Sequence, residues 1–175
     1  MNQASFETPI NFTELPYPPI QINERNMNYE KLMLDNVAGS TSELSTISLY
    51  CYNSLITKRQ YPEISAAFHE LMIIEMHHLE IFGTIATQLG ADPRWWSWRA
   101  NKNMYWSPGY NKYSMRLKDI LANAIKHENF SIDKYTKQAS NIRDMNIVEN
   151  LHRIIIDEKK HVEILTGLFN KYICE

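Results

Sequence analysis

Cysteine is scarce in this sequence of 175 residues, and the two cysteines present, Cys51 and Cys174, form no CxxC motif. Two isolated cysteines cannot build the disulfide framework of a small secreted domain, and they supply too few thiolates for a structural zinc site. We therefore expect both thiols to be free, which is typical of the reducing cytosol, and we predict a cytoplasmic protein.

Long apolar runs and an excess of charge of one sign are also missing. No stretch of 18 apolar residues occurs, and the first residues lack the basic and apolar regions of a signal peptide, so we expect neither a membrane span nor a leader. The 18 Lys and Arg residues nearly balance the 20 Asp and Glu residues. This balance predicts no surface for nucleic acid or for an anionic membrane.

Glycine and proline are few, with five and seven residues, and their placement divides the chain. Residues 1–25 hold four of the seven prolines. Each proline removes a backbone donor and disfavours the helical region for the residue before it, so we predict an extended N-terminal arm here. The sequence leaves open whether the arm packs across the domain, packs on a neighbouring subunit, or is a floppy tail.

Residues 26–175 are expected to form one all-α domain, a four-helix bundle, because long stretches free of proline favour long helices. Asn26 or Asn28 is a suitable first cap, Pro62 suits a first helical turn, and Gly90 suits the position after a helix end. The predicted helices cover residues 28–58, 62–89, 113–139 and 144–172.

The segment between the second and third predicted helices is irregular and holds all four tryptophans. We predict no strand in it. At about 3.3 Å per residue, some 23 residues can run the full length of a bundle. The segment therefore predicts a long crossover, with the second and third helices parallel. We expect the tryptophans to belong to the core or to a subunit interface rather than to an active-site lid.

Each predicted helix carries one glutamate in the middle of its inward face, and two of these glutamates extend to a Glu-x-x-His motif. The single glutamates are Glu43 and Glu128, and the motifs are Glu75 with His78 and Glu158 with His161. Residues three apart on a helix point the same way. A buried carboxylate needs a partner or a metal, and four of them cannot neutralise each other, whereas two divalent cations can. A metal-free bundle would leave the four carboxylates unpaired.

The spacing puts both members of each helix pair at one level. Glu43 and Glu75 are 32 residues apart, Glu128 and Glu158 are 30 apart, and the midpoints fall on the predicted turns. Each glutamate then lies about 22–24 Å from its turn, in the middle of a helix about 42–46 Å long. The sequence therefore predicts a dinuclear metal site at mid-height in the bundle.

This arrangement resembles the ferritin-like superfamily of di-iron and di-manganese carboxylate proteins, nearest to rubrerythrins and manganese catalases, over about residues 28–172. The resemblance implies a ferritin-like bundle that holds two Fe or Mn ions per chain. It implies that Glu75 and Glu158 bridge the two ions. It also implies that Glu43 and His78 complete one ion, and Glu128 and His161 the other.

Further positions match the relatives around the site. Tyr50 lies seven residues after Glu43, as a tyrosine does in both relatives, and Tyr135 lies seven after Glu128. We expect the Tyr50 hydroxyl to donate to Glu158 or Glu75. Asp157 resembles the aspartate of a DExxH motif that orients a histidine on the facing helix. The corresponding position in the second helix is Ile74, so this feature is not repeated there.

The chain also departs from rubrerythrins. Their third helix carries an ExxE motif that supplies a seventh ligand, whereas here Ile125 and Ser131 flank Glu128. Rubrerythrins also carry a rubredoxin domain with cysteine-bound iron, and the two isolated cysteines of this sequence cannot supply such a site.

Oxygen and nitrogen ligands suit Mn, Fe or Zn, and a carboxylate-rich pair of redox metals performs O₂ or peroxide chemistry. We expect an oxidoreductase that acts on hydrogen peroxide, of catalase or peroxidase type, in a homo-oligomer. Disproportionation needs no outside reductant, whereas a peroxidase would need a separate electron donor protein. Two alternatives remain open: iron oxidation and storage in a shell-forming oligomer, and a coat or assembly protein that retains a metal site.

Overall fold

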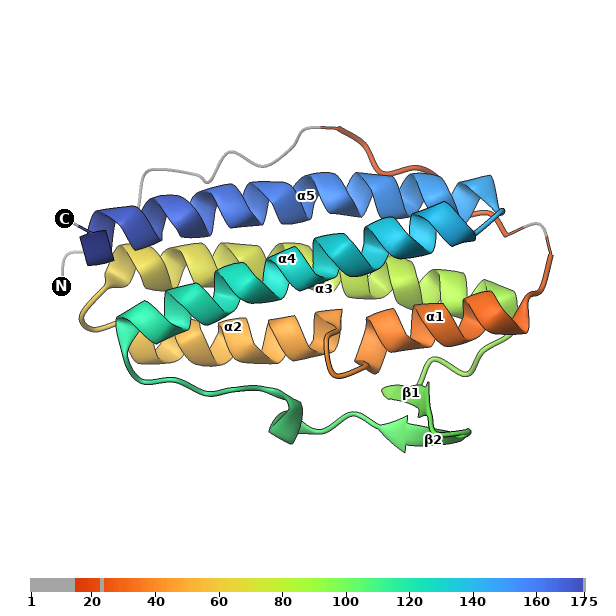
Figure 1. The fold of residues 1–175 in the computed structure, drawn as a ribbon, viewed down its shortest axis with the longest axis horizontal. Coiled ribbons are helices and arrows are strands. Elements are labelled where there is room, and N and C mark those ends of the chain that lie inside the picture. The colour runs from red at the N-terminus through yellow and green to blue at the C-terminus, as the bar shows by residue number, and fades with distance from the viewer. Residues whose placement is uncertain (1–14, 23, 175) are drawn as a thin grey trace, which may run out of the picture.

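The computed structural model describes residues 15–22 and 24–174, and it shows the predicted helical bundle with a ferritin-like fold (Figure 1). Three long helices and one broken helix occupy the four positions. The elements are α1 (Met27–Ala38), α2 (Glu43–Thr57), α3 (Pro62–Leu89), α4 (Leu117–Asn141) and α5 (Met145–Phe169), which continues in the π-helical turn η2 (Asn170–Cys174).

The first bundle position is where the prediction of one helix over residues 28–58 is wrong. Helix α1 ends at Ala38, and α2 begins at Glu43 (Figure 1). The Ser42 side chain accepts a hydrogen bond from the Ser45 amide and so caps α2. Short hydroxyl side chains of this kind compete with the backbone hydrogen bonds of a continuous helix, which favours the break. Glu43 therefore lies in the first turn of α2, where the helix dipole favours a carboxylate.

A lysine from another helix stabilises this break. Lys134 of α4 donates to the carbonyl oxygens of Asp35 and Thr41, at 3.2 and 2.7 Å, and pairs with the Asp35 carboxylate at 3.1 Å. The Asp35 carbonyl also accepts a hydrogen bond from the Gly39 amide at 2.9 Å, so Lys134 is its second donor, whereas Thr41 lies in the break itself, where helical backbone bonds are interrupted. Ser40, which a continuous helix would turn inward, is exposed.

The other helix bounds are close to the predicted ones. Helix α3 covers the predicted residues and ends before Gly90, whose φ of 107° is the left-handed conformation that glycine adopts readily. The Asn26 side chain caps α1 by accepting from the amides of Asn28 and Tyr29. Helix α4 begins four residues later than predicted, and α5 ends at Phe169.

The crossover between α3 and α4 runs the length of the bundle, so these two helices are parallel, as predicted (Figure 1). The prediction that it holds no strand is wrong. Strands β1 (Trp96–Arg99) and β2 (Lys102–Tyr105) form an antiparallel hairpin, followed by the 3₁₀ turn η1 (Pro108–Tyr110). Ala100 and Asn101 have φ values of 49° and 61°, as a two-residue hairpin turn of type I′ requires.

The tryptophans of the crossover divide into two groups. Trp96 and Trp106 pack against the core, and the Trp106 indole donates to Ser45 Oγ at 2.9 Å. Trp95 and Trp98 are exposed, with Lys31 of α1 lying 4.7 Å from the Trp98 ring. The hydrogen bond from Trp106 to Ser45 thus holds the crossover against the first turn of α2.

Two apolar clusters make up the core. One surrounds Phe82 and Tyr135 and includes much of α1, while the other surrounds Phe68 and Tyr50 towards the opposite end of the bundle. Along the three long helices, buried acidic and histidine side chains lie between these clusters: Glu75, His78, Glu128, Glu158 and His161.

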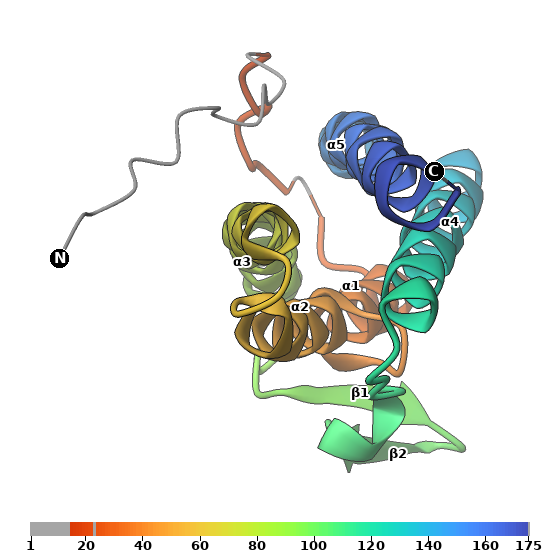
Figure 2. The ribbon, with the colours of Figure 1, turned by 90° about the vertical axis from the view of Figure 1, so that its left-hand side faces the viewer.

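The described part of the N-terminal arm, residues 15–22, is extended and lies along the side of the bundle where α3 faces α5 (Figure 2). Arg153 Nε of α5 donates to the Leu15 carbonyl at 2.9 Å, and the Ile22 amide donates to Gln88 Oε1 of α3 at 3.1 Å. Residues 1–14 and 23 of the predicted arm lie outside the described residues.

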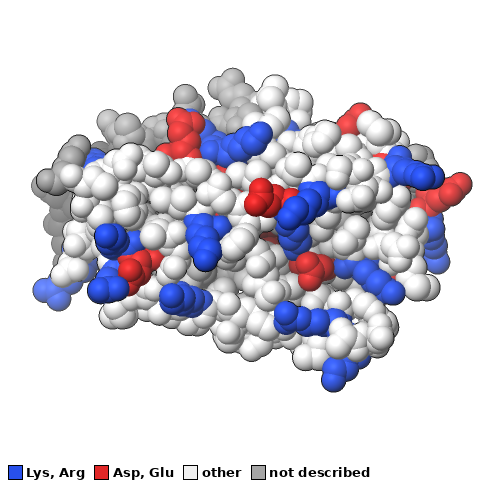
Figure 3. Space-filling view, in the orientation of Figure 1, with Lys and Arg blue, Asp and Glu red and all other residues white. Residues whose placement is uncertain are grey.

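The visible face in Figure 3 has Lys and Arg side chains distributed over it with Asp and Glu among them. Within the described part of the chain, no helix is both long enough and apolar enough to span a membrane.

Candidate metal centre

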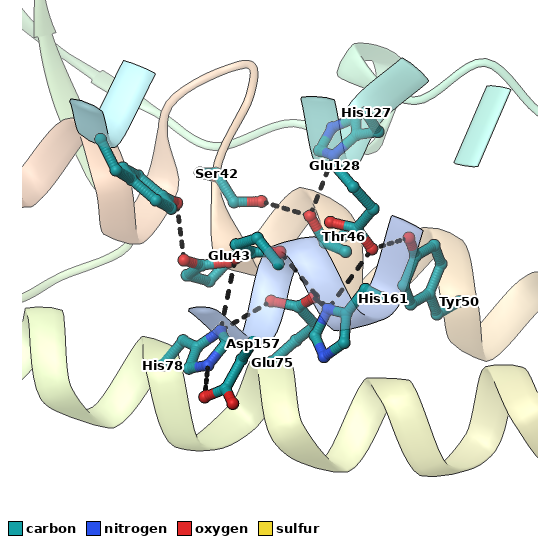
Figure 4. Close-up of polar contacts among 12 residues, drawn as sticks. Ser42, Glu43, Thr46, Tyr50, Glu75, His78, His127, Glu128, Asp157 and His161 are labelled. Atoms are coloured by element: carbon teal, nitrogen blue, oxygen red, sulfur yellow. Dashed lines mark hydrogen bonds and ion pairs between the residues drawn. The ribbon is translucent and has the colours of Figure 1, made fainter. Parts of the chain in front are cut away.

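The structure brings all six sequence-predicted metal ligands together at mid-bundle (Figure 4). One comes from α2, one from α4, and two each from α3 and α5. Their ligand atoms form two groups, within each of which the atoms lie within 4.8 Å of one another. The first group is Glu43, Glu75, His78 and Glu158, and the second is Glu75, Glu128, Glu158 and His161. Glu75 and Glu158 belong to both.

The two histidines present the same ring nitrogen to the shared glutamates. His78 Nδ1 lies 3.2 Å from Glu75 Oε2 and 3.5 Å from Glu158 Oε1. His161 Nδ1 lies 2.9 Å from Glu75 Oε1 and 3.3 Å from Glu158 Oε2. All these side chains are fully buried, so the site is an approximately twofold arrangement around two central carboxylates.

The site suits cations because many of its buried atoms have no well-directed hydrogen bond. These atoms are Glu43 Oε2, Glu75 Oε1, Glu128 Oε2, both carboxylate oxygens of Glu158 and both ring nitrogens of His161. Leaving such atoms unsatisfied is costly, and a cation at the points where they converge would satisfy them. Four carboxylates and two imidazoles, without thiolate, fit Fe or Mn.

Electrostatics divides the four glutamates into two pairs. Burial, and then the charges of Glu75 and Glu158, raise the pKa values of Glu43 and Glu128 well above the usual range. Burial also opposes ionisation of Glu75 and Glu158, but the contacts with the two histidines lower the pKa values of both. The negative charge of the metal-free cluster is therefore concentrated on the two shared glutamates.

Comparisons with known families and solved structures show the family and the fold of the chain. The model of the rubrerythrin family matches residues 37–169. The chain belongs to the rubrerythrin family. Two solved structures of KatB, a manganese catalase from Anabaena, superimpose with a TM-score of 0.77 and 19% sequence identity, covering 91% of this chain and 78% of that chain. At this identity the likeness shows a shared fold. No curated protein matches the chain.

In this rubrerythrin-family chain, two buried tyrosines bind the unshared glutamates in a crossed manner. Tyr135 of α4 donates to Glu43 Oε1 of α2 at 2.6 Å, and Tyr50 of α2 donates to Glu128 Oε1 of α4. The prediction that Tyr50 donates to Glu158 or Glu75 is therefore wrong. Because α2 and α4 are antiparallel (Figure 1), a residue two turns beyond either glutamate comes level with the opposite one.

Aromatic rings support these tyrosines. The ring of Tyr50 lies 5.1 Å from that of Phe68, and the ring of Tyr135 lies 5.1 Å from that of Phe82, both in tilted arrangements. Burial raises the pKa values of both phenols, and the nearby carboxylates raise them further. The two hydroxyls therefore remain protonated donors at neutral pH.

Asp157 lies beside His78, on the side away from the shared glutamates (Figure 4). Asp157 Oδ2 is 3.2 Å from His78 Nε2, and Asp157 Oδ1 is 2.6 Å from Arg153 Nη1. Tyr17 of the arm donates to Asp157 Oδ2 at 2.5 Å. Burial opposes ionisation of Asp157, but hydrogen bonds from His78, Arg153 and Tyr17 lower its pKa to about 2.

Sequence reasoning missed Tyr17, Arg153 and Thr46. Arg153 could have been found, because it lies four residues before Asp157 and thus on the same helix face. Nothing in the sequence placed the arm, so Tyr17 gave no signal. Thr46 Oγ1 lies 3.1 Å from His127 Nδ1 and donates to the Ser42 carbonyl, which ties α4 to the start of α2.

Proposed function

We propose that this protein is a dinuclear Mn or Fe oxidoreductase that acts on hydrogen peroxide, as a catalase or as a peroxidase. The observation that carries the proposal is the pair of buried ligand groups that share Glu75 and Glu158. Membership of the rubrerythrin family and the fold shared with a manganese catalase support it.

In this proposal, Glu43 and His78 hold one ion, Glu128 and His161 hold the other, and the two shared glutamates hold both. When bound, two such ions supply one electron each, so a pair can take up and return the two electrons of peroxide disproportionation without an outside reductant.

The protein's own groups then fix the ligands and keep bulk water out. Tyr135 and Tyr50 hold one oxygen of Glu43 and one of Glu128, which limits how each carboxylate can turn. Phe82 and Phe68 cover these phenols from the apolar clusters on either side. Each phenol also keeps a proton within hydrogen-bond distance of a carboxylate oxygen, where the donated hydrogen bond offsets part of the negative charge of that carboxylate.

The test combines metal analysis with peroxide turnover. Native, untagged protein is analysed for Mn and Fe, and apo protein loaded with each metal is then given hydrogen peroxide. We expect two ions per chain and either evolution of O₂ or, with an added electron donor, consumption of peroxide without O₂. Glu158→Gln should lose metal and turnover, whereas Glu149→Gln, on the exposed face of α5, should keep both.

Two outcomes would overturn the proposal. The first is protein that binds neither metal at the six ligands. The second is fully loaded protein that is inert to peroxide but oxidises and accumulates many Fe ions per chain, which would instead favour iron storage.

A further inference from the structure

The two halves of the metal centre differ in what lies behind each histidine. His78 Nε2 faces Asp157 Oδ2 at 3.2 Å. His161 Nε2, by contrast, has no hydrogen-bond partner among the described residues, although it is fully buried. The residue before Glu75 that corresponds to Asp157 is Ile74, which cannot accept a hydrogen bond. The approximate twofold symmetry, which the two crossed tyrosines share, therefore does not extend to the groups behind the two histidines.

The N-terminal arm adds to this difference by holding Asp157 in place. Tyr17 Oη donates to Asp157 Oδ2 at 2.5 Å and lies 3.4 Å from His78 Nε2. The Tyr17 ring packs edge-on against the ring of His77, with 4.6 Å between centroids. These contacts place the phenol directly over the Asp157–His78 pair.

Arg153 fastens the arm from the other side. Its guanidinium carbon lies 4.2 Å from the centre of the Tyr17 ring, and its Nη1 lies 2.6 Å from Asp157 Oδ1. Its Nε donates to the Leu15 carbonyl, two residues before Tyr17, at 2.9 Å. One cation thus binds the arm backbone, the tyrosine ring and the aspartate together.

We propose that Tyr17 is a positioning residue for the metal centre, and that through Asp157 it makes the position of Glu43 and His78 bind its ion more tightly than the position of Glu128 and His161. The inference rests on the proposed dinuclear function and adds to it an order of metal binding. A histidine whose outer nitrogen is held by a carboxylate is fixed in orientation and is a more basic ligand. His161 has no such support, so its ion should bind second and leave first.

The size of each expected effect depends on how many contacts separate the residue from the ion. Asp157 acts through His78, and Tyr17 acts through Asp157 and then His78. Loss of a residue that holds a metal-bound histidine typically lowers metal affinity by 10- to 100-fold, which is what we expect for Asp157→Asn. Tyr17→Phe keeps the ring over Arg153 and leaves Asp157 in place, so we expect a loss of about tenfold or less. Tyr29→Phe is the matched control, because the Tyr29 hydroxyl binds the Arg143 amide, away from the site.

The experiment titrates full-length apo protein with Mn²⁺ and measures the free ion by its electron paramagnetic resonance signal. Wild-type protein should bind two ions in two distinguishable steps. His161→Ala and His78→Ala each leave one complete position, so they assign the steps. Tyr17→Phe should weaken binding in the His161→Ala background and leave binding in the His78→Ala background unchanged, and the control should change neither.

The outcomes separate the two proposals. If wild-type protein binds no Mn²⁺ or Fe²⁺, the dinuclear function fails, and this inference fails with it. If two ions bind with equal affinity, the proposed order of binding is overturned. If Tyr17→Phe weakens both single-position variants equally, Tyr17 has a general structural role and the inference is again overturned. In both cases the proposed function stands. Circular dichroism confirms that each variant is folded.

Discussion

Replacing Tyr135 by phenylalanine tests whether the crossed tyrosines support the metal centre or merely fill the core. The substitution keeps the ring, and with it the tilted contact to Phe82 at 5.1 Å, but it removes the donor to Glu43 Oε1. Glu43 Oε2 already has no hydrogen-bond partner among the described residues. The variant therefore removes the hydrogen bond that satisfies Oε1 of this buried carboxyl group.

The size of the effect follows from this loss. Leaving a buried acceptor without its partner costs about 1–3 kcal/mol. A chain of this length changes its melting temperature by about 2–4 °C per kcal/mol, so apo Tyr135→Phe should melt about 2–12 °C below the wild type. Turnover with peroxide should fall more than metal content, because the ligands remain while Glu43 loses its orientation.

The assay needs three measurements on each variant: thermal unfolding of the apo protein by circular dichroism, metal content by mass spectrometry, and turnover of the loaded protein. Tyr50→Phe should behave like Tyr135→Phe, because Tyr50 holds Glu128 in the same way. Tyr113→Phe, at a half-exposed ring beside Tyr52, is the control and should match the wild type. If Tyr135→Phe keeps wild-type stability and full turnover, the hydrogen bond to Glu43 contributes nothing and the reasoning is refuted.

Three further predictions concern the ligands, the helix break and the pH. Glu158→Ala should lose both metal ions and Glu43→Ala mainly one, and equal stoichiometry in native mass spectrometry would contradict the shared role of Glu158. Lys134→Met should lower the melting temperature, since it removes the donor to two backbone carbonyls at the break, and an unchanged value would mean that the break holds without it. Glu63→Gln should destabilise the protein at pH 7 by less than about 1 kcal/mol, because the ion pair with Lys171 is half exposed. Hydrogen bonds from Lys171 and Tyr172 lower the pKa of Glu63, so this contribution is complete above the pKa of the unfolded chain. It should disappear as the pH falls through the pKa of folded Glu63, and a penalty that persists there would show that charge is not its source.

The sequence by itself determined the features that depend on local periodicity. Glu75 and His78 lie on one face because they are three residues apart on one helix, and Pro62 and Gly90 set the bounds of that helix whatever surrounds it. Equal distances from the turns then placed the glutamates at one level. The crossover was predictable because its length exceeds what a tight turn needs.

Tertiary structure decided the features that join segments far apart in the chain. Lys134 of α4 binds backbone carbonyls on both sides of Gly39 and Ser40 at the break, and the partner of Tyr50 depends on the antiparallel offset of α2 and α4. The arm contacts Asp157 through Tyr17, and it contacts Arg153 through the Tyr17 ring and the Leu15 carbonyl, some 140 residues away. These contacts leave no periodic trace in the sequence. Periodicity shows which face of a helix is buried, but the partner of a buried polar atom is set only when the helices pack.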